Sequence, residues 1–313
     1  MPASTATAPG KIILFGEHAV VYGRPAIAVP VNQVRARAIV MPDILGKQGS
    51  ILIQAPDIGL EASLDSLATD HPLALAVRNV LDKLDCQTVP AFQLRVTSTI
   101  PLAAGMGSGA AVSVAIIRAV SDFLGQPLPD EQVCSLAFEV EKLHHGTPSG
   151  IDNTVITYNH PVYFVRGQGV ETFRVQTPIT MVIGDTGIQS PTAIAVGDLC
   201  KAWQAAPEKY EVLFDQVGTI TQSARQALET GIIQSLGPLM DRNHALLQEM
   251  GVSSPELDRL VEAARQAGAL GAKLSGAGRG GNMIALTSPQ ASAVVAEAIH
   301  NCGATRTLIF SLQ

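Results

Sequence analysis

Residues 101–111 read PLAAGMGSGAA, and this glycine-rich run decides how the rest of the chain is understood. A β-like segment (AFQLRVTSTI, 91–100) precedes it, and an apolar-periodic helix is predicted over 110–124 directly after it. The glycines allow a tight turn whose N–H groups can approach a guest closely, and the helix N-terminus adds unpaired donors and the positive end of its dipole. The pattern predicts a loop that holds an anion such as a phosphate; the competing interpretation is a small-residue turn that packs a helix on a sheet.

Two familiar phosphate-binding motifs do not fit. The chain has no G-x-x-x-x-G-K-[ST] run, which excludes a Walker-type loop. The pattern G-x-G-x-x-[GA] occurs at Gly105 and again at Gly276. A dinucleotide fold requires a strand, the glycine turn, a helix and then a parallel strand. The first occurrence leads into two successive helices and the second into a strand, so neither is a Rossmann site.

Composition and charge narrow the class of protein. The chain has 313 residues, enough for one large or two medium domains. Charged residues make up 15% and aromatic residues 4%, which favours an α/β or α+β enzyme packed through small side chains. The formal net charge of -6 argues against a nucleic-acid or membrane-surface partner, because phosphates would repel it.

The cysteines and the N-terminus indicate a cytoplasmic protein. Cys86, Cys134, Cys200 and Cys302 are far apart and form no C-x-x-C pair, so we expect buried free thiols in a reducing compartment and no structural metal. The opening MPASTATAPGK lacks the pattern of a secretory signal, and no apolar stretch reaches 18 residues.

Hydrophobic periodicity predicts an α+β chain that changes character near residues 175–180. The first part is strand-rich and the second helix-rich. Strands are predicted at 12–15, 26–29, 34–40, 51–54, 92–99, 155–158, 162–165, 179–183, 283–286 and 305–310. Helices are predicted at 71–84, 110–124, 130–145, 192–203, 210–229, 233–250, 255–267 and 289–302.

The segment 8–23 reads APGKIILFGEHAVVYG and carries three candidate functional side chains. Strict alternation in a half-buried strand would make Lys11 an ordinary solvent residue, whereas its place just after Pro-Gly suggests a lysine that enters a cleft. Glu17 and His18 follow a glycine at the strand end, where ligand contacts commonly lie.

The segment 141–153 reads EKLHHGTPSGIDN and contains two acids in a turn-rich setting. Glu141 on the last turns of a helix and Asp152 after the turn can converge on one point. Two carboxylates facing a phosphate loop suit Mg²⁺; alternatively one acid holds the metal and the other accepts a substrate proton. The simpler interpretations are a helix-surface charge for Glu141 and a turn carboxylate for Asp152. The adjacent His144 and His145 point in different directions on a helix, so a shared metal site is not expected.

A second glycine-rich run, KLSGAGRGGN, occupies 273–282. It is either a tight turn between two elements or a wall placed against nucleotide phosphates.

Taken together, these four segments resemble the GHMP kinases, the family of galactokinase, homoserine kinase, mevalonate kinase and phosphomevalonate kinase. The order of the lysine strand, the glycine-serine loop, G-x-P-S-G-x-D and G-A-G-x-G-G matches from residue 8 to residue 286. Within the family, the run at 8–23, H-G-x-P-S-G-x-D-N at 145–153 and D-T-G-x-x-x-x-T at 185–192 are most similar to the mevalonate kinases.

The resemblance implies an ATP- and Mg²⁺-dependent kinase that phosphorylates the C5 hydroxyl of mevalonate in isoprenoid precursor synthesis. Asp152 would be the catalytic carboxylate and Lys11 its cationic partner, while Glu141 and Ser108 would bind Mg²⁺. Glu17, His18 and Thr192 would hold mevalonate. The loop around the ATP phosphates would comprise Pro101, Ala103, Ala104, Gly105, Met106, Gly107, Ser108, Gly109, Ala110 and Ala111.

Three positions depart from the family pattern. Gly109 stands where a second loop serine is usual, which leaves Ser108 or a water as the Mg²⁺ ligand. Ser275 replaces a threonine. Arg279 replaces a glycine, where it either adds a cation near the phosphates or points to solvent.

The resemblance also implies a two-domain GHMP kinase fold. Residues 1–176 would form an N-terminal, ribosomal-S5-like βαβ domain and residues 177–313 a helix-rich, ferredoxin-like domain, with the site in the crevice between them. A homodimer is the family tendency. The substrate that accepts the phosphoryl group could also be a different one, as in a phosphomevalonate kinase, a mevalonate 3-kinase or a sugar kinase. A silent, ligand-sensing member is disfavoured because Lys11, Glu141 and Asp152 are all retained.

Overall fold

The computed structural model describes residues 2–101, 104–145, 149–168, 170–189 and 192–313, without the side chains of residues 144, 145, 192 and 193. The chain divides into two compact units. Unit 1 comprises Met1–Gly10, Val34–Pro101 and Gly107–Asn159, and unit 2 comprises Lys11–Gln33, Leu102–Met106 and His160–Gln313. Each unit is therefore assembled from segments that are distant in sequence. The boundary near residue 176 remains a prediction about domains along the chain.

Unit 1 is built on a mixed sheet with a parallel crossover. Its strands are β3 (Ile51–Ala55), β4 (Leu60–Ser63) and β5 (Phe92–Ser98), together with residues 4–10 of β1 (Ser4–Phe15) and 34–42 of β2 (Ala26–Pro42). Their order is β4-β3-β5-β2, and β1 also pairs with β2. Strands β3 and β5 are parallel, with Leu52 opposite Gln93, and the chain between them carries helix α1 (Pro72–Lys83). This is the βαβ arrangement expected of the N-terminal part, because parallel neighbours need a long crossover.

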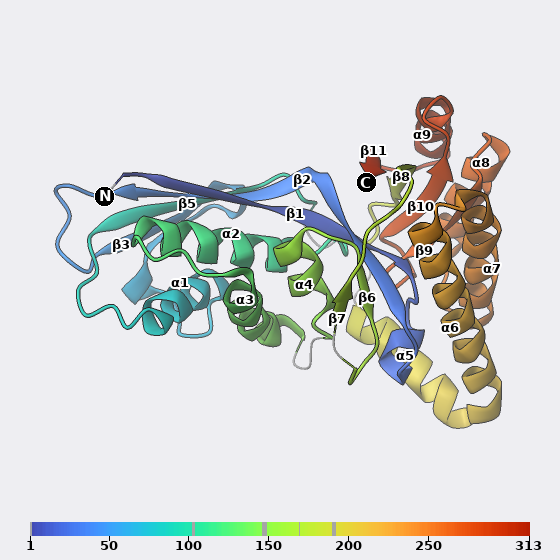
Figure 1. Cartoon of the computed structure of the whole chain (residues 1–313), viewed down its shortest axis with the longest axis horizontal. Coiled ribbons are helices and arrows are strands. Elements are labelled where there is room, and N and C mark those ends of the chain that lie inside the picture. The colour runs from blue at the N-terminus through green and yellow to red at the C-terminus, as the bar shows by residue number, and fades with distance from the viewer. Residues whose placement is uncertain (1, 102–103, 146–148, 169, 190–191) are drawn as a thin grey trace. The chain divides into compact units, whose positions relative to one another are not determined.

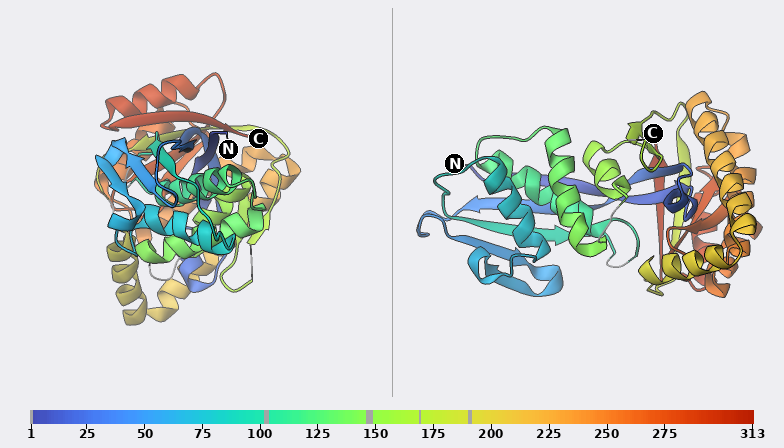
Figure 2. Two further views of the ribbon diagram at one scale, coloured as in Figure 1. Left: turned by 90° about the vertical axis from the view of Figure 1, so that its left-hand side faces the viewer. Right: turned by 90° about the horizontal axis from the view of Figure 1, so that it is seen from below.

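Alternating burial shows which face of this sheet is covered. The second half of β2 buries Val34, Ala36, Ala38 and Val40 and turns the residues between them outward. Helices α1, α2 (Ser108–Phe123), α3 (Asp130–His145) and α4 (Ile151–Tyr158) lie together on one face of the sheet (Figures 1 and 2). The two-residue period thus buries the apolar side chains on one face and turns the half-buried Arg35 and the exposed Arg37 to the other.

Unit 2 contains a four-stranded antiparallel sheet. Its strands are β8 (Ile179–Asp185), β9 (Gly271–Ser275), β10 (Asn282–Thr287) and β11 (Arg306–Leu312), in the order β11-β8-β10-β9. This order, with β10 inserted between β8 and β9, is ferredoxin-like, as expected. In the same unit, β6 (Val162–Phe164) pairs with the first residues of β2, and β7 (Val170–Thr172) pairs with β6.

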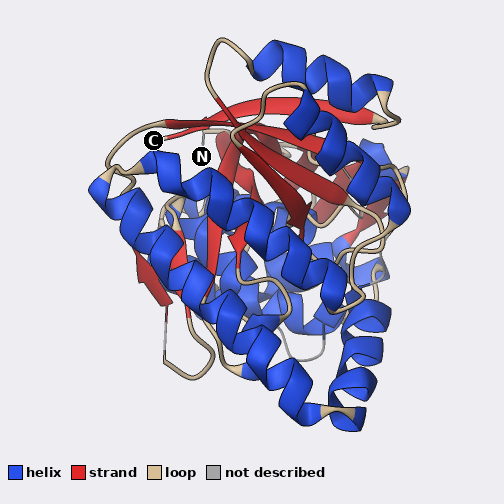
Figure 3. Cartoon of the chain, turned by 90° about the vertical axis from the view of Figure 1, so that its right-hand side faces the viewer, coloured by secondary structure: helices blue, strands red, loops and turns tan. Residues whose placement is uncertain are grey.

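The helices of unit 2 pack on this sheet and on one another. They are α5 (Thr192–Ala205), α6 (Pro207–Thr230), α7 (Leu236–Glu249), α8 (Pro255–Gln266) and α9 (Ser292–Asn301), with short 3-10 helices η1 (Ala19–Tyr22) and η4 (Ile233–Ser235). Helices α7, α8 and α9 contact the strands, and α6 lies against α7, as Figure 3 shows with helices in blue and strands in red. Among the described residues, no helix combines the length and apolarity that crossing a membrane requires.

One predicted element is wrong. The β-like run 155–158 belongs to helix α4, not to a strand. Gly150 adopts the left-handed conformation at the N-cap of α4 and makes no side-chain capping bond. The Thr154 hydroxyl donates back to the Gly150 carbonyl at 2.7 Å, a bond that Thr makes inside helices. Burial of the branched side chains then outweighs their strand propensity.

Other differences are smaller. Segments 26–29 and 34–40 form the single long strand β2, while β4, β7 and β9 were not predicted. The short helices η2 (Pro56–Ile58) and η3 (Leu64–Ser66) flank β4. All four cysteines are free, as expected, but Cys302 is exposed and the others are half-buried.

Candidate active site

A tight turn follows β1 and carries two of the predicted site residues. Gly16 has a φ of 93°, and a Cβ there would lie 2.3 Å from the Pro25 carbonyl oxygen, so only glycine fits. His18 also has a positive φ, 61°. Successive main-chain hydrogen bonds close the turn, including Val20 N to Gly16 O at 3.2 Å and Val21 N to His18 O at 2.9 Å. The turn therefore holds Glu17 and His18 in a defined, strained conformation.

Glu17 forms a buried ion pair with Lys273 of β9. The lysine side chain is fully buried and also donates to the Leu274 carbonyl at 2.6 Å. The second carboxylate oxygen of Glu17, Oε2, is buried and has no hydrogen-bond partner among the described residues. Burial raises the pKa of Glu17, while Lys273 and nearby main-chain N–H groups oppose the rise. One carboxylate oxygen of Glu17 thus binds Lys273, and the other has no hydrogen-bond donor among the described residues.

His18 presents a second buried acceptor. Its Nε2 lies 2.9 Å from the Ala277 carbonyl oxygen, and this acceptor assigns the proton to Nε2. Its Nδ1 is buried without a partner in the described part of the chain. Burial lowers the pKa of His18 to about 4, with a small contribution from Arg279, so the ring is neutral at pH 7. Glu17 Oε2 and His18 Nδ1 are therefore two buried acceptors on consecutive residues, suited to ligand hydroxyl groups.

The second glycine-rich run forms a sharply turning loop after β9. Gly276, Gly278, Gly280 and Gly281 all have positive φ. A Cβ on Gly278 would lie 1.8 Å from the Val252 carbonyl oxygen, so this position requires glycine. The hydroxyl of Ser275, which stands in place of the family's threonine, donates to the Ile13 carbonyl at 2.7 Å. The loop is thereby fastened to β1.

Arg279 is exposed, as one of its two predicted positions implies, and it also forms an ion pair that was not predicted. It has a φ of 57°, and its Nη1 lies 2.6 Å from Asp198 Oδ2 on α5. Its main-chain N–H donates to the Val252 carbonyl at 2.9 Å. The guanidinium therefore links the glycine loop to helix α5.

The residues of the loop 101–111 fall into both units. In unit 2, Ala104 and Met106 are buried, and their carbonyls accept from Asn282 Nδ2 at 2.5 Å and from Lys11 N at 3.0 Å, respectively. The Lys11 side chain is only 7% exposed, which rules out the ordinary solvent position. Ala103 lies outside the described residues, and the preceding Pro101 is half-buried.

The remainder of the loop, in unit 1, starts helix α2. Gly107 is its N-cap, with a φ of 71° and no side-chain hydrogen bond to the helix, and Ser108 is the first helical residue. Gly109, Ala110 and Ala111 complete the first turn. Since the first N–H groups of a helix have no intrahelical acceptor, this glycine-capped end is suited to an anion.

The two predicted acids belong to packed helices of unit 1. Glu141 on α3 is 4% exposed, which rules out a surface charge. Asp152 is half-buried in the first turn of α4. Asn153 Nδ2 donates to the Cys134 carbonyl at 3.2 Å and so ties α4 to α3. His144 and His145 end α3, and their side chains lie outside the description.

Unit 2 therefore gathers Glu17 and His18 with Lys273, and it also contains Lys11. Asp152, Glu141 and Ser108 lie in unit 1. The meeting of Lys11 with Asp152 stays a prediction, as does the role of Thr192, which begins α5 and whose side chain is not described. Sequence reasoning missed the partnership of Glu17 with Lys273. A lysine as the one charged residue in the run GAKLSG was the signal, because a buried cation requires a buried acid.

Comparison with known proteins agrees with this fold. Residues 72–160 match the family model described as GHMP kinases N terminal domain, and residues 224–305 match that for GHMP kinases C terminal. The chain belongs to the GHMP kinase family. The mevalonate kinase of Pyrococcus furiosus is 38% identical over 320 residues, covering 96% of this chain and 93% of that protein. The mevalonate kinase of Aeropyrum pernix is 35% identical and covers 91% and 88%.

Solved structures give the same relationship. The structure of L. major mevalonate kinase in complex with R-mevalonate has a TM-score of 0.84 at 33% identity, covering 99% of this chain and 95% of that one. The Methanococcus jannaschii mevalonate kinase has a TM-score of 0.84 at 25% identity, covering 98% and 96%.

Proposed function

We propose that this protein is a mevalonate kinase, which transfers the γ-phosphoryl group of ATP to the C5 hydroxyl of mevalonate in the synthesis of isoprenoid precursors. The observation that carries this proposal is the buried turn in which Glu17 Oε2 and His18 Nδ1, on consecutive residues, are acceptors without partners among the described residues. The relatives that are mevalonate kinases, at 38% identity over 96% of the chain, support the same acceptor.

Each predicted residue then has a role. Main-chain N–H groups of the loop 101–111 and the start of α2 bind the ATP phosphates, and Lys11 adds a positive charge. Asp152 orients the acceptor hydroxyl and takes its proton, and a nearby Lys11 keeps that carboxylate ionised. Glu17, His18 and Thr192 hold mevalonate. Phosphoryl transfer proceeds through a loose transition state, so positioning and charge neutralisation supply most of the catalysis.

The donor set suits Mg²⁺. Glu141 offers a carboxylate at a buried position, and Ser108 offers a hydroxyl at the helix start. Among the described residues, no three His, Cys, Asp or Glu side chains cluster as a metal cage. Mg²⁺ needs no such cage, because it is commonly held by one or two carboxylates, substrate phosphates and waters. When bound, the ion would neutralise charge on the phosphates, and Ser108 or a water would occupy the position that Gly109 leaves without a hydroxyl.

The surroundings of Arg24 weigh against a phosphorylated acceptor. A second phosphate on the substrate would need an additional cation near the turn, and Arg24 is the neighbouring arginine in sequence. Its guanidinium is instead paired with Glu211 at 2.5 Å and Asp215 at 2.8 Å. A coupled assay that compares mevalonate, phosphomevalonate and galactose tests this point. We expect ADP release with mevalonate, and preferential turnover of either other compound would refute the assignment.

Asp152→Asn tests the chemistry. Loss of the acceptor for the hydroxyl proton is expected to lower kcat by about 100-fold or more while the KM for ATP stays close to that of the wild type. Asp122→Asn, at an exposed position of α2, is the control and should keep full turnover. Turnover of Asp152→Asn within a fewfold of the wild type would remove this residue from the proposed role.

We also propose a cytoplasmic homodimer with domains at 1–176 and 177–313. The four free cysteines support a reducing compartment. Light scattering measures the oligomeric state directly.

A further inference from the structure

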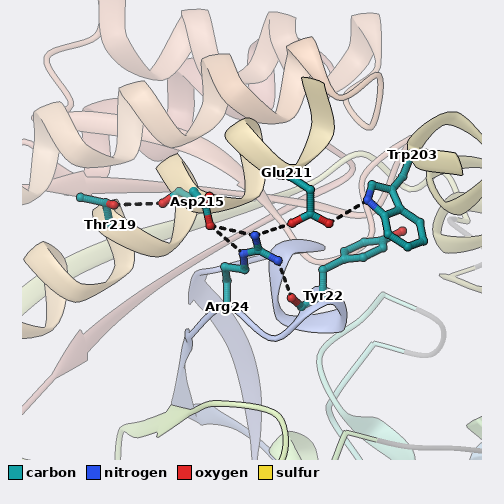
Figure 4. A network of polar contacts seen from close by, with 6 residues as sticks. All are labelled: Tyr22, Arg24, Trp203, Glu211, Asp215 and Thr219. Carbon is teal, nitrogen blue, oxygen red and sulfur yellow. Dashed lines mark hydrogen bonds and ion pairs between the residues drawn. The ribbon is translucent and has the colours of Figure 1, made fainter. Parts of the chain in front are cut away.

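The turn that carries Glu17 and His18 is also fastened to helix α6, at the end remote from Lys273. Arg24, just after the turn, donates from Nη1 to the Tyr22 carbonyl at 2.7 Å. Its Nη2 donates to Glu211 Oε2 at 2.5 Å and to Asp215 Oδ1 at 2.8 Å, as Figure 4 shows. The main-chain N–H of Arg24 also donates to the Ala19 carbonyl at 3.2 Å. One guanidinium thus joins the turn to two carboxylates of α6.

Aromatic packing reinforces the same junction. The rings of Tyr22 and Phe214 are stacked, with centroids 4.1 Å apart and an interplanar angle of 12°. Trp203 of α5 packs on the same tyrosine at 5.2 Å. Offset aromatic pairs add to the free energy of burial, so the turn is fixed here by packing as well as by charge.

Glu211 connects this junction to a second helix. While Oε2 accepts from Arg24, Oε1 accepts from Trp203 Nε1 at 2.9 Å. Both oxygens are therefore used, one for the turn and one for α5 (Figure 4). Helix α5 is in turn bound to the glycine loop through Asp198 and Arg279, and the Ala277 carbonyl of that loop accepts from His18.

These contacts connect the turn to α5 by two routes. The first runs through Arg24, Glu211 and Trp203. The second runs through His18 and the 276–281 loop, whose Arg279 pairs with Asp198 of α5. We propose that Glu211 is a positioning residue for the acceptor site, because it links the turn that bears Glu17 and His18 to the helix that begins at Thr192. This inference rests on the proposed function, in which both elements bind mevalonate. Glu211 itself does not touch the substrate; it acts by holding two binding elements in register.

The test compares two glutamates of the same helix. Glu211→Gln keeps an amide oxygen for Trp203 but removes the charge that holds Arg24. Glu229→Gln is the matched control, because Glu229 also lies on α6, also pairs with an arginine (Arg225, 3.0 Å), and has the same 39% side-chain exposure as Glu211. We expect Glu211→Gln to raise the KM for mevalonate about tenfold or more while the KM for ATP stays within about twofold, since misplaced binding groups affect the substrate that they hold. Glu229→Gln should leave both values unchanged.

Trp203 supplies an independent readout because it is the chain's single tryptophan. Addition of mevalonate alone should change its fluorescence in the wild type and in Glu229→Gln, and the change should be much smaller in Glu211→Gln. If Glu211 has only a structural role, Glu211→Gln will lower the unfolding midpoint but keep the wild-type ratio of the two KM values. The fluorescence change on addition of mevalonate will then also match the wild type. That result overturns the inference. An equal rise in both KM values overturns it too. If the wild type releases no ADP with mevalonate, the proposed function fails first and the inference falls with it.

Discussion

At the scale of single residues, the charge pair of Glu17 and Lys273 dominates the site. Neither side chain reaches solvent, and the two lie 256 positions apart in the chain. Taking two charges out of water is unfavourable unless each compensates the other, so the pair is sensitive to the loss of either partner.

Lys273→Met is therefore expected to destabilise the protein by about 3–5 kcal/mol, because it leaves the Glu17 carboxylate buried without its cation. The free energy of unfolding in urea measures this. The double variant Glu17→Gln/Lys273→Met removes both charges and should recover a large part of the loss. Lys201→Met, whose side chain is 81% exposed, is the control and should stay within about 0.5 kcal/mol of the wild type. Additive effects of the two buried substitutions would contradict a coupled pair.

At this scale the sequence indicates which polar side chains are buried better than it indicates which residues they contact. The sequence singles out Lys11 and Glu141 for their place in turn-rich segments, and both are buried, so neither is an ordinary surface charge; their roles stay predictions. The contact of Arg279 with Asp198 and that of Arg24 with α6 were not predicted. Both depend on helices that lie far along the chain, and no local pattern reports such a neighbour.

At the scale of elements, the loop after β9 contains glycines that are required for two different reasons, the backbone conformation and the lack of space for a side chain. Gly276 and Gly278 both have positive φ, but the space around them differs. A Cβ on Gly276 would meet nothing within 4 Å, whereas on Gly278 it would collide with the Val252 carbonyl.

Gly276→Ala should therefore cost only the left-handed backbone strain, about 1–2 kcal/mol. Gly278→Ala adds a collision with main-chain atoms and should cost several kcal/mol more, or prevent folding altogether. Urea unfolding of the two variants side by side measures the difference. Equal losses would show that the loop can move away from Val252.

Predictions of elements succeeded where the pattern is long and regular. Helix α3 was predicted at 130–145 and occupies those residues, and α8 differs from its prediction by one residue. The error at 155–158 arose from a branched run, TVIT, whose local preference is for strands. Packing of α4 against α2 and α3 decides the outcome there.

At the scale of the whole molecule, two buried histidines make folding depend on pH. Burial lowers the pKa of His18 to about 4, and burial also lowers that of His244 to about 4, although Asp258 opposes this shift. His244 is held between α8 and β9: its Nε2 lies 3.2 Å from Asp258 Oδ1, and its Nδ1 accepts from Leu274 N at 3.3 Å. Both rings are therefore folded in the neutral form.

In the unfolded chain these histidines have a pKa of about 6.5. Between that value and about 4 the unfolded state binds more protons, so the free energy of unfolding falls as the pH is lowered. From pH 7 to pH 5 each histidine should contribute a loss of about 2 kcal/mol. Urea unfolding across this range measures the loss, and His244→Gln should remove about half of it. An unchanged pH dependence in that variant would exclude His244, and His300→Gln, at an exposed position on α9, is the control.

Local rules account for what could be read from the chain alone: the α+β class, most helices, the glycine-capped start of α2 and the identity of the candidate side chains. Helix periodicity, capping and left-handed glycine turns depend on residues within a few positions of one another. The partners of those side chains depend on contacts across hundreds of positions, such as Ser275 with Ile13, Lys273 with Glu17, and Arg24 with Glu211. Side chains become buried and charges become paired only when distant segments pack together. Only the tertiary structure could therefore identify these partners.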